Sequence, residues 1–176
     1  MARVEPLSVD KFHRDLLTFE EASLLLEEIN WANPFYYACN CIAVATGMRL
    51  GEIRGIISET WRGTHVDVRY SYSDRGDLGS TKMKERRIVM IPTQVADLVE
   101  RIRCKTGFIL SHNDGETPIS GNRTTVALNN ALKKIGISDD ERKTRGLTFH
   151  GWHHWFNTMM RSAGCARLKN HDDDGT

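Results

Sequence analysis

The sequence predicts an α+β domain that is mostly helical and carries a small antiparallel β-sheet. Amphipathic segments with helical spacing lie in both the first and the last third of the chain. Between them lies a segment in which β-branched and aromatic residues alternate with others, as they do in strands. At 176 residues, without an internal repeat or a long linker, the chain has the size of one compact domain.

The first helices are predicted from their start and stop signals. Thr18 and Glu21 have the spacing of a capping box, and apolar residues at helical spacing follow them. Pro34 suits the first turn of a second helix, which continues along an apolar face to Ala45. A Thr-Gly pair then breaks this helix, and residues 49–56 are expected to begin a short third one.

The middle of the chain is where the sheet is expected. Residues 64–72 (THVDVRYSY) alternate and predict a strand, and residues 80–91 predict a basic hairpin or strand that ends in the apolar run IVMI. Residues 94–103 predict a helix, and residues 108–110 (FIL) a short apolar element.

The last third of the chain is again predicted to be helical. Ser120 is expected to cap a helix over residues 122–135, and residues 149–163 are expected to form the last helix. Between these two helices, Ser138 and Glu141 again have capping-box spacing.

The domain boundaries follow from these elements. Residues 1–17 show no clear periodicity of hydrophobic residues and are predicted to be a linker or arm. Residues 18–165 form the predicted domain. Residues 166–176 are polar and divergent, and we expect a disordered tail there.

Composition argues against several classes of protein. No apolar run approaches the roughly 20 residues of a membrane span, and no signal peptide is recognisable after Arg3. Cys39 and Cys41 are too close to bridge comfortably and lack zinc-ligand spacing, so the cysteines are expected in the core. We therefore expect a cytoplasmic protein.

The net charge of +1 conceals an uneven distribution. Residues 1–30 carry seven acidic and three basic side chains, whereas residues 82–87 (KMKERR) carry four basic and one acidic. A second basic group, Arg142, Lys143 and Arg145, precedes a histidine-rich stretch. Such local patches can bind an anion even though the whole chain is nearly neutral.

Two stretches carry candidate chemistry. In residues 45–56 (ATGMRLGEIRGI), Arg49 and Glu52 open a helix, where a guanidinium beside free backbone N–H groups suits a phosphate. The alternative is a plain helix break with a surface arginine. In residues 147–164 (LTFHGWHHWFNTMMRSAG), three histidines lie within five positions, and they suit metal binding, acid–base chemistry or packing: His150, His153 and His154.

Three stretches together resemble the catalytic domain of the tyrosine recombinases, the phage integrase family. ATGMRLGEI resembles the box with the first catalytic arginine, STKMKERRIVMIP the basic hairpin with the catalytic lysine, and LTFHGWHHWFNTMMRSAG the His-x-x-Arg-His box. They occur in the family's order, and LLTFEEASLLLEEI resembles the first helix of that domain. The resemblance covers roughly residues 15–165.

The resemblance implies DNA cleavage by a tyrosine that attacks a phosphodiester, with arginines stabilising the transition state and no metal or other cofactor. It makes Arg49 the first clamp and Lys82 the general acid, with Lys84 as the substitute if the hairpin register shifts. His150 becomes the acid–base histidine, and His154 a hydrogen-bonding or packing residue. The remaining implied roles are DNA-backbone contacts by Lys84, Arg86 and Arg87, orientation of basic side chains by Glu52, and core packing by Trp155, Phe156 and Met159.

Two departures from the family pattern predict a degenerate domain. His153 stands where the box has its second arginine, and imidazole cannot make a bidentate phosphate contact. All four tyrosines precede the histidine stretch, so the nucleophile is missing and we expect a truncated or frameshifted gene product that cannot cleave DNA alone. Because residue 1 already lies in the predicted linker, we also expect the family's N-terminal helical domain to be absent.

Three functional hypotheses remain open at this point. The first is a DNA-binding catalytic-domain fragment of a phage or mobile-element integrase, whose partners are double-stranded DNA and full-length integrase protomers, one of which could donate a tyrosine in trans. The second is a non-catalytic DNA-binding or dimerising modulator of an intact integrase. The third is a metal-dependent hydrolase, because His150 and His154 have the i,i+4 spacing of zinc ligands, although no glutamate lies between them.

Overall fold

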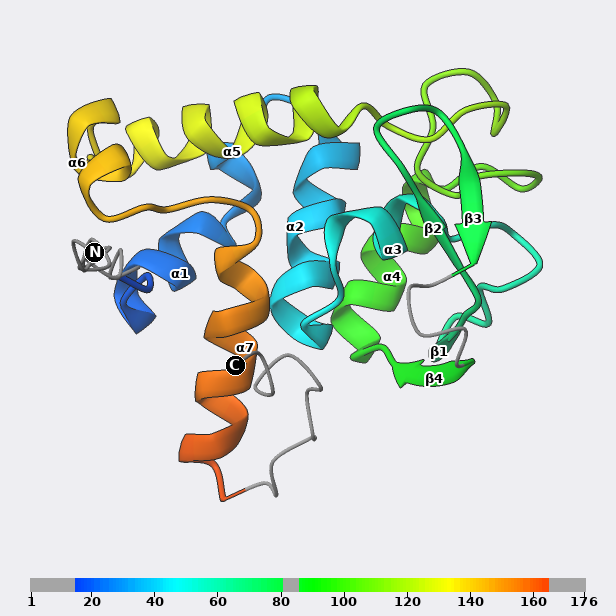
Figure 1. Ribbon diagram of the computed structural model, residues 1–176, viewed down its shortest axis with the longest axis horizontal. Coiled ribbons are helices and arrows are strands. Elements are labelled where there is room, and N and C mark those ends of the chain that lie inside the picture. Colours follow the sequence, from blue (N-terminus) through cyan, green and yellow to red (C-terminus); the bar gives the residue numbers. More distant parts are fainter. Residues whose placement is uncertain (1–14, 81–85, 165–176) are drawn as a thin grey trace, which may run out of the picture.

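The computed structural model describes residues 15–80 and 86–164 and shows a helical body with β-strands along one side (Figure 1). The helices are α1 (Phe19–Leu25), the 3₁₀ helix η1 (Glu28–Asn30), α2 (Pro34–Thr46), α3 (Leu50–Arg54), α4 (Thr93–Ile102), α5 (Gly121–Lys134), α6 (Asp139–Thr144) and α7 (Gly151–Ser162). The strands are β1 (His65–Val68), β2 (Tyr70–Tyr72), β3 (Leu78–Ser80) and β4 (Arg87–Met90). This arrangement confirms the predicted α+β class. The segments predicted as a linker and a tail, except for residues 15–17, lie outside the described residues.

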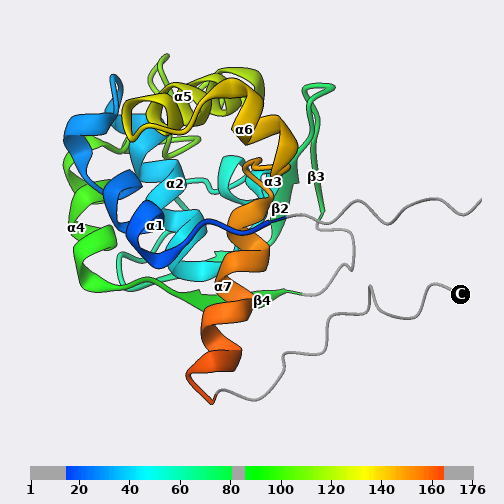
Figure 2. The same ribbon diagram turned by 90° about the vertical axis from the view of Figure 1, so that its left-hand side faces the viewer.

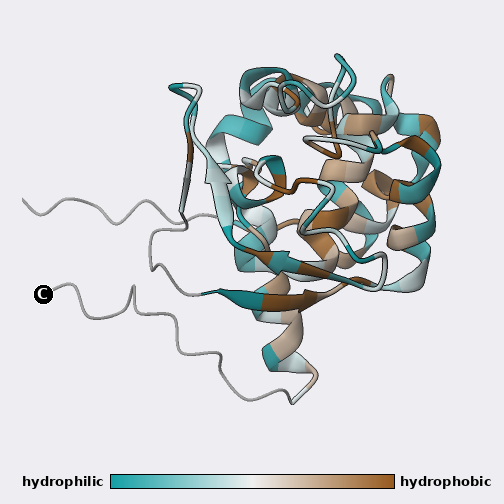
Figure 3. Cartoon of the chain, turned by 90° about the vertical axis from the view of Figure 1, so that its right-hand side faces the viewer, coloured by the Kyte–Doolittle hydropathy of each residue, from teal (hydrophilic) through white to brown (hydrophobic). Residues whose placement is uncertain are grey.

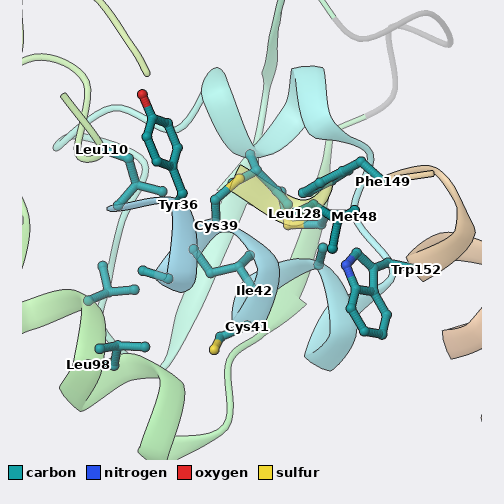
Figure 4. Packing of buried hydrophobic residues seen from close by; sticks show 14 of the residues in the cluster. Tyr36, Cys39, Cys41, Ile42, Met48, Leu98, Leu110, Leu128, Phe149 and Trp152 are labelled. Atoms are coloured by element: carbon teal, nitrogen blue, oxygen red, sulfur yellow. The ribbon is translucent and has the colours of Figure 1, made fainter. Parts of the chain in front are cut away.

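Helix α2 forms the centre of the core. It packs against α3, α4, α5 and α7, and its apolar run leaves Ala38, Cys39, Ile42 and Ala43 without solvent exposure (Figure 4). A helix that is apolar on most of its surface has to be covered on all sides, which explains its position. Burial raises the pKa of the Cys39 thiol above its usual range and that of Cys41 to about 12, as expected for inert core cysteines.

A buried polar contact fixes α7 against α2. The Trp152 indole N–H donates to the Asn40 side-chain oxygen at 2.8 Å, and the Asn40 amide donates to the Tyr36 carbonyl at 2.8 Å. Trp152 and Asn40 are each 1% exposed. Because both polar groups are satisfied, the contact positions the histidine-bearing helix without leaving an unpaired donor in the core.

The predicted capping box at the start of α1 is present in full. The Thr18 hydroxyl accepts from the Glu21 N–H at 3.2 Å, and the Glu21 carboxylate accepts from the Thr18 N–H at 2.8 Å. Glu21 also binds the Arg145 guanidinium at 2.7 Å, which joins α1 to the end of α6. The hydrogen bond from Arg145 holds the pKa of the Glu21 carboxyl below its usual range.

The strands form two short antiparallel pairs. Val68 of β1 pairs with Arg87 of β4, and Tyr70 of β2 pairs with Ser80 of β3. The strand predicted over residues 64–72 is therefore divided at one residue, Arg69. Residues 81–86 separate β3 from β4 in the sequence, so the basic segment is flanked on each side by a paired strand.

Residues 108–110 form a short apolar element, as expected: Phe108 makes an isolated bridge to Ile57, and the buried Ile109 donates to the Ile56 carbonyl at 3.2 Å. One expectation about burial was wrong. Helix α7 is less buried than expected, with Trp152 its one fully buried residue, because its C-terminal end extends beyond the helical body (Figures 1 and 2). The side chains expected in the core are only partly buried: Trp155, Phe156 and Met159.

Hydropathy follows this architecture. Figure 3 shows hydrophobic residues concentrated within the helical body, whereas the turn that joins β2 to β3 is largely hydrophilic. Among the described residues, no helix is both long and apolar enough to cross a membrane.

Candidate functional site

The break between α2 and α3 is built on Gly47. This residue has a φ of 65°, and a Cβ added there would lie 2.5 Å from the Phe156 ring of α7. Glycine is required on both counts, because other residues are strained at this φ and none has room for its Cβ. The tight contact brings α7 against the segment that leads into Arg49, which is the N-cap residue of α3.

Glu52 connects this segment to the sheet. Its carboxylate is 5% exposed, and one of its oxygens accepts from the Arg49 backbone N–H at 2.9 Å and from the Arg87 guanidinium at 2.7 Å. Burial alone would raise the pKa of the Glu52 carboxyl, but the hydrogen bonds from Arg87 and from the Arg49 N–H outweigh it and hold this pKa below its usual range. The expected pairing of Glu52 with a basic side chain is confirmed.

His153 makes a second connection, from α7 to Gly47. Its Nδ1 lies 2.6 Å from the Gly47 carbonyl oxygen, and its Nε2 lies 3.2 Å from the side-chain nitrogen of Asn157. A carbonyl can only accept, so Nδ1 carries the proton, and Nε2 then accepts from the amide of Asn157. Both ring nitrogens of His153 are therefore engaged in contacts within the protein.

The other two histidines complete a cluster of imidazole rings. His150 is the N-cap residue of α7, its ring is stacked on that of His153 with centroids 5.6 Å apart, and it meets the His154 ring edge-on at 4.8 Å. Both His150 and His154 are exposed at this end of α7. Among the described residues, no group of three or more His, Cys, Asp or Glu side chains is arranged to hold a metal ion.

The three stretches singled out in the sequence therefore meet. The Gly47–His153 hydrogen bond joins the first stretch to the third, and the Arg87–Glu52 ion pair joins the second to the first. Arg86 is exposed beside β4, and the Arg87 side chain stays 45% exposed although it binds Glu52. Lys82 and Lys84 lie outside the described residues.

The second basic group does not form a patch. Arg145 is 16% exposed and its guanidinium binds Glu21 and Glu141 at 2.7 and 2.9 Å, so its charge is neutralised inside the protein. Arg142 lies 3.6 Å from Asp139 in the same helix. The expectation of anion binding there was wrong for Arg145, because its guanidinium binds Glu21, which is distant in sequence, and Glu141, four residues away in α6.

Arg54 is a supporting residue that sequence reasoning missed. It is 7% exposed, donates to the Ile119 carbonyl at 2.9 Å, binds Asp74 at 2.7 Å and lies over the Tyr72 ring at 5.0 Å. It thereby fixes α3 to the turn of the β2–β3 hairpin and to the segment that enters α5. No local spacing distinguishes it from a surface arginine.

Comparison with solved structures identifies this arrangement. The Tn1549 transposon integrase in complex with transposon right end DNA superposes with a TM-score of 0.73 at 18% identity, over 91% of this chain and 57% of that one. The XerA recombinase gives 0.64 at 18% identity, over 92% and 54%. The catalytic domain of bacteriophage HP1 integrase gives 0.57 at 19% identity, over 88% and 76%. The chain has the fold of a tyrosine recombinase catalytic domain.

This tyrosine recombinase fold agrees with the resemblance seen in the sequence. No protein-family model and no curated protein matches the sequence. The chain spans little more than half the length of the Tn1549 integrase and XerA structures. The fold places Arg49 and the three histidines in one region of the domain.

Proposed function

We propose that this tyrosine-recombinase-like domain binds the backbone of duplex DNA within the integration or recombination machinery of a phage or another mobile element. The observation that carries the proposal is the 2.6 Å contact between His153 and Gly47, which brings the histidine cluster next to the segment leading into Arg49. Two structures with the same fold, the Tn1549 integrase and lambda integrase, are described as DNA complexes.

The geometry around Arg49 suits a phosphate ligand. A guanidinium is planar, permanently charged and able to bind two phosphate oxygens at once. The Glu52 carboxylate binds the Arg49 backbone N–H, so it fixes the main chain from which this guanidinium extends. Because the same carboxylate binds Arg87, it also holds the strand that follows the basic segment close to Arg49.

The basic segment between Ser80 and Arg87 supplies the further DNA contacts in this proposal. Its two flanks are paired with β2 and β1, so both ends of the segment are fixed relative to the sheet. We assign Lys82 the role of general acid, with Lys84 as its substitute, and assign backbone contacts to Lys84, Arg86 and Arg87. His150 is the proposed acid–base residue, and His154 is a hydrogen-bonding or packing residue beside it.

We further propose that these 176 residues do not cleave DNA on their own. His153 cannot act as a second clamp while both its ring nitrogens are bonded within the protein, and loss of one such donor costs about 10² to 10³ in rate. Two of the four tyrosines are held in contacts within the protein. Tyr37 donates its hydroxyl to the Leu26 carbonyl at 2.7 Å, burial raises its pKa above the usual range, and Tyr72 packs on Arg54.

The bridge made by His153 also favours a second candidate function. A residue that serves packing at the clamp position suits a non-catalytic module that binds DNA, or pairs with intact integrase protomers, and so modulates their activity. Adding an intact integrase protomer that can donate a tyrosine distinguishes the two candidate functions. Only the catalytic-domain fragment predicts strand cleavage when this partner is added; the non-catalytic module predicts none.

The experiment is fluorescence anisotropy of a labelled duplex with the wild type, Arg49→Ala and the control Arg101→Ala, which removes an exposed arginine of α4. We expect Arg49→Ala to weaken binding by about tenfold at low salt, and the control by less than about twofold. Equal losses in both variants, or no binding by the wild type, would reject the Arg49 site.

A further inference from the structure

A cavity of about 500 Å³ opens at the N-terminal end of α2 and is lined by residues of α2 and α5. Figure 1 shows α5 crossing that end of α2. Its volume lies within the range of small-molecule sites. Asn33 lines the cavity and caps the start of α2, whereas Gly47 ends the same helix. A 13-residue helix is roughly 20 Å long, so this cavity and the Arg49 site lie at opposite ends of α2.

The charges around the cavity favour an anion. Arg123 and Lys134 of α5 line it, and none of its lining residues is acidic. Within the described part of the chain, Arg123 forms no ion pair, and Lys134 reaches only the Ile29 carbonyl, at 3.4 Å. Its neighbour Lys133 points elsewhere and binds Asp139 at 2.7 Å, so the two adjacent lysines have different roles.

Tyr36 and His112 form an aromatic wall of the cavity beside these cations. The His112 ring nitrogen lies 3.3 Å from the Tyr36 hydroxyl, and the His112 ring meets the rings of Phe35 and Tyr36 edge-on with centroids 4.9 and 5.6 Å apart. These contacts fix the orientation of His112, which lines the cavity. A ligand ring placed there would find an aromatic surface with a polar edge.

Amide groups supply the remaining hydrogen-bonding capacity. Asn33 uses its side-chain oxygen to accept from the Phe35 N–H at 3.0 Å, which leaves its NH₂ group for other partners. The Asn130 side chain makes no hydrogen bond to any described residue. Amides of this kind recognise the edge of a heteroaromatic ring, because they can both donate and accept.

We propose that this cavity binds a small ligand with a phosphate and a planar heteroaromatic ring, of the nucleoside monophosphate class. Arg123 and Lys134 bind the phosphate, the wall of Tyr36 and His112 packs against the ring, and Asn130 binds the ring edge. The site does not depend on the proposed DNA function, since it uses residues at the other end of α2.

The test is a titration of the ¹⁵N-labelled protein with AMP, followed by NMR at the side-chain amides of Asn33 and Asn130 and at the His112 ring. We expect saturable shifts at these groups and weaker shifts with adenosine or inorganic phosphate alone. Arg123→Ala should weaken AMP binding by about tenfold, the loss of one charge-assisted hydrogen bond. Asn130→Asp should weaken AMP binding as well, because the substitution adds a carboxylate, which repels the phosphate, to the lining of the cavity.

Lys143→Ala, which removes an exposed cation of α6 outside the cavity, is the matched control and should leave AMP binding unchanged. Shifts that do not saturate, or that occur near Arg49 instead, would overturn the proposal. An unlabelled duplex that displaces AMP, together with equal losses of duplex and AMP binding in Arg123→Ala, would also overturn it, because Arg123 would then belong to the DNA-binding surface.

Discussion

The Nδ1 of His153 donates to the carbonyl oxygen of Gly47 across 2.6 Å. Gly47 ends α2 two residues before Arg49, so this hydrogen bond fixes the position of α7 relative to the proposed phosphate site. This histidine, which the sequence resemblance aligns with a clamp arginine, thereby acts as an internal bridge.

Removing the bridge should destabilise the domain. We expect His153→Ala to lower the free energy of unfolding by about 1 to 3 kcal/mol, because the Gly47 carbonyl and the Asn157 amide both lose a partner. His154→Ala, a change at an exposed neighbour, should cost much less. Urea unfolding of both variants measures the difference, and equal losses would show that the bridge contributes nothing.

Glu52 gives a prediction that depends on pH. Its folded-state pKa is lowered, so its ionised form contributes stability at pH values above the unfolded-state pKa, and this contribution is lost as pH falls through the folded pKa. Glu52→Gln should therefore be less stable than the wild type near neutral pH, by about 1 to 3 kcal/mol. This difference in the free energy of unfolding between the wild type and Glu52→Gln should become steadily smaller as the pH is lowered. Denaturant titrations from pH 7 to pH 3 measure it, and a gap that does not change with pH would refute the role of the charge.

The buried Asn40–Trp152 contact predicts non-additive losses. Trp152→Phe removes the indole donor and leaves the Asn40 oxygen buried without it, which should cost about 2 to 5 kcal/mol when the lost volume is included. The double variant Asn40→Leu/Trp152→Phe also removes the unpaired oxygen. The free energy of unfolding that it loses should therefore be smaller than the sum of the losses in Trp152→Phe and in Asn40→Leu. Thermal unfolding of the three variants completes the cycle. Strictly additive losses would mean that the two side chains are not coupled.

Much of the fold follows from local signals in the sequence. Thr18, Ser120 and Ser138 all act as caps where expected, with side chains that accept from the N–H three residues later. Capping geometry involves only neighbouring residues, so spacing alone predicts it. The box at Ser138 is only half formed, because the Glu141 carboxylate binds Arg145 instead of returning to the cap.

Contacts between distant residues could not be predicted in this way. Arg54 and Arg145 resemble surface arginines in the sequence, yet each is neutralised by an acidic residue at least 20 positions away. Similarly, the apolar spacing of α7 predicted burial, but spacing does not specify which partner covers that face. The convergence of the three stretches was expected from their resemblance to a family and not from their local patterns.

The most direct test of the proposed phosphate site is the salt dependence of duplex binding. Anisotropy titrations at several salt concentrations give the slope of the logarithm of affinity against the logarithm of salt concentration for the wild type and for Arg49→Ala. If Arg49 neutralises one DNA phosphate, the slope of the variant should be shallower by about 0.9. Identical slopes would contradict a phosphate contact by Arg49, even if the variant binds more weakly.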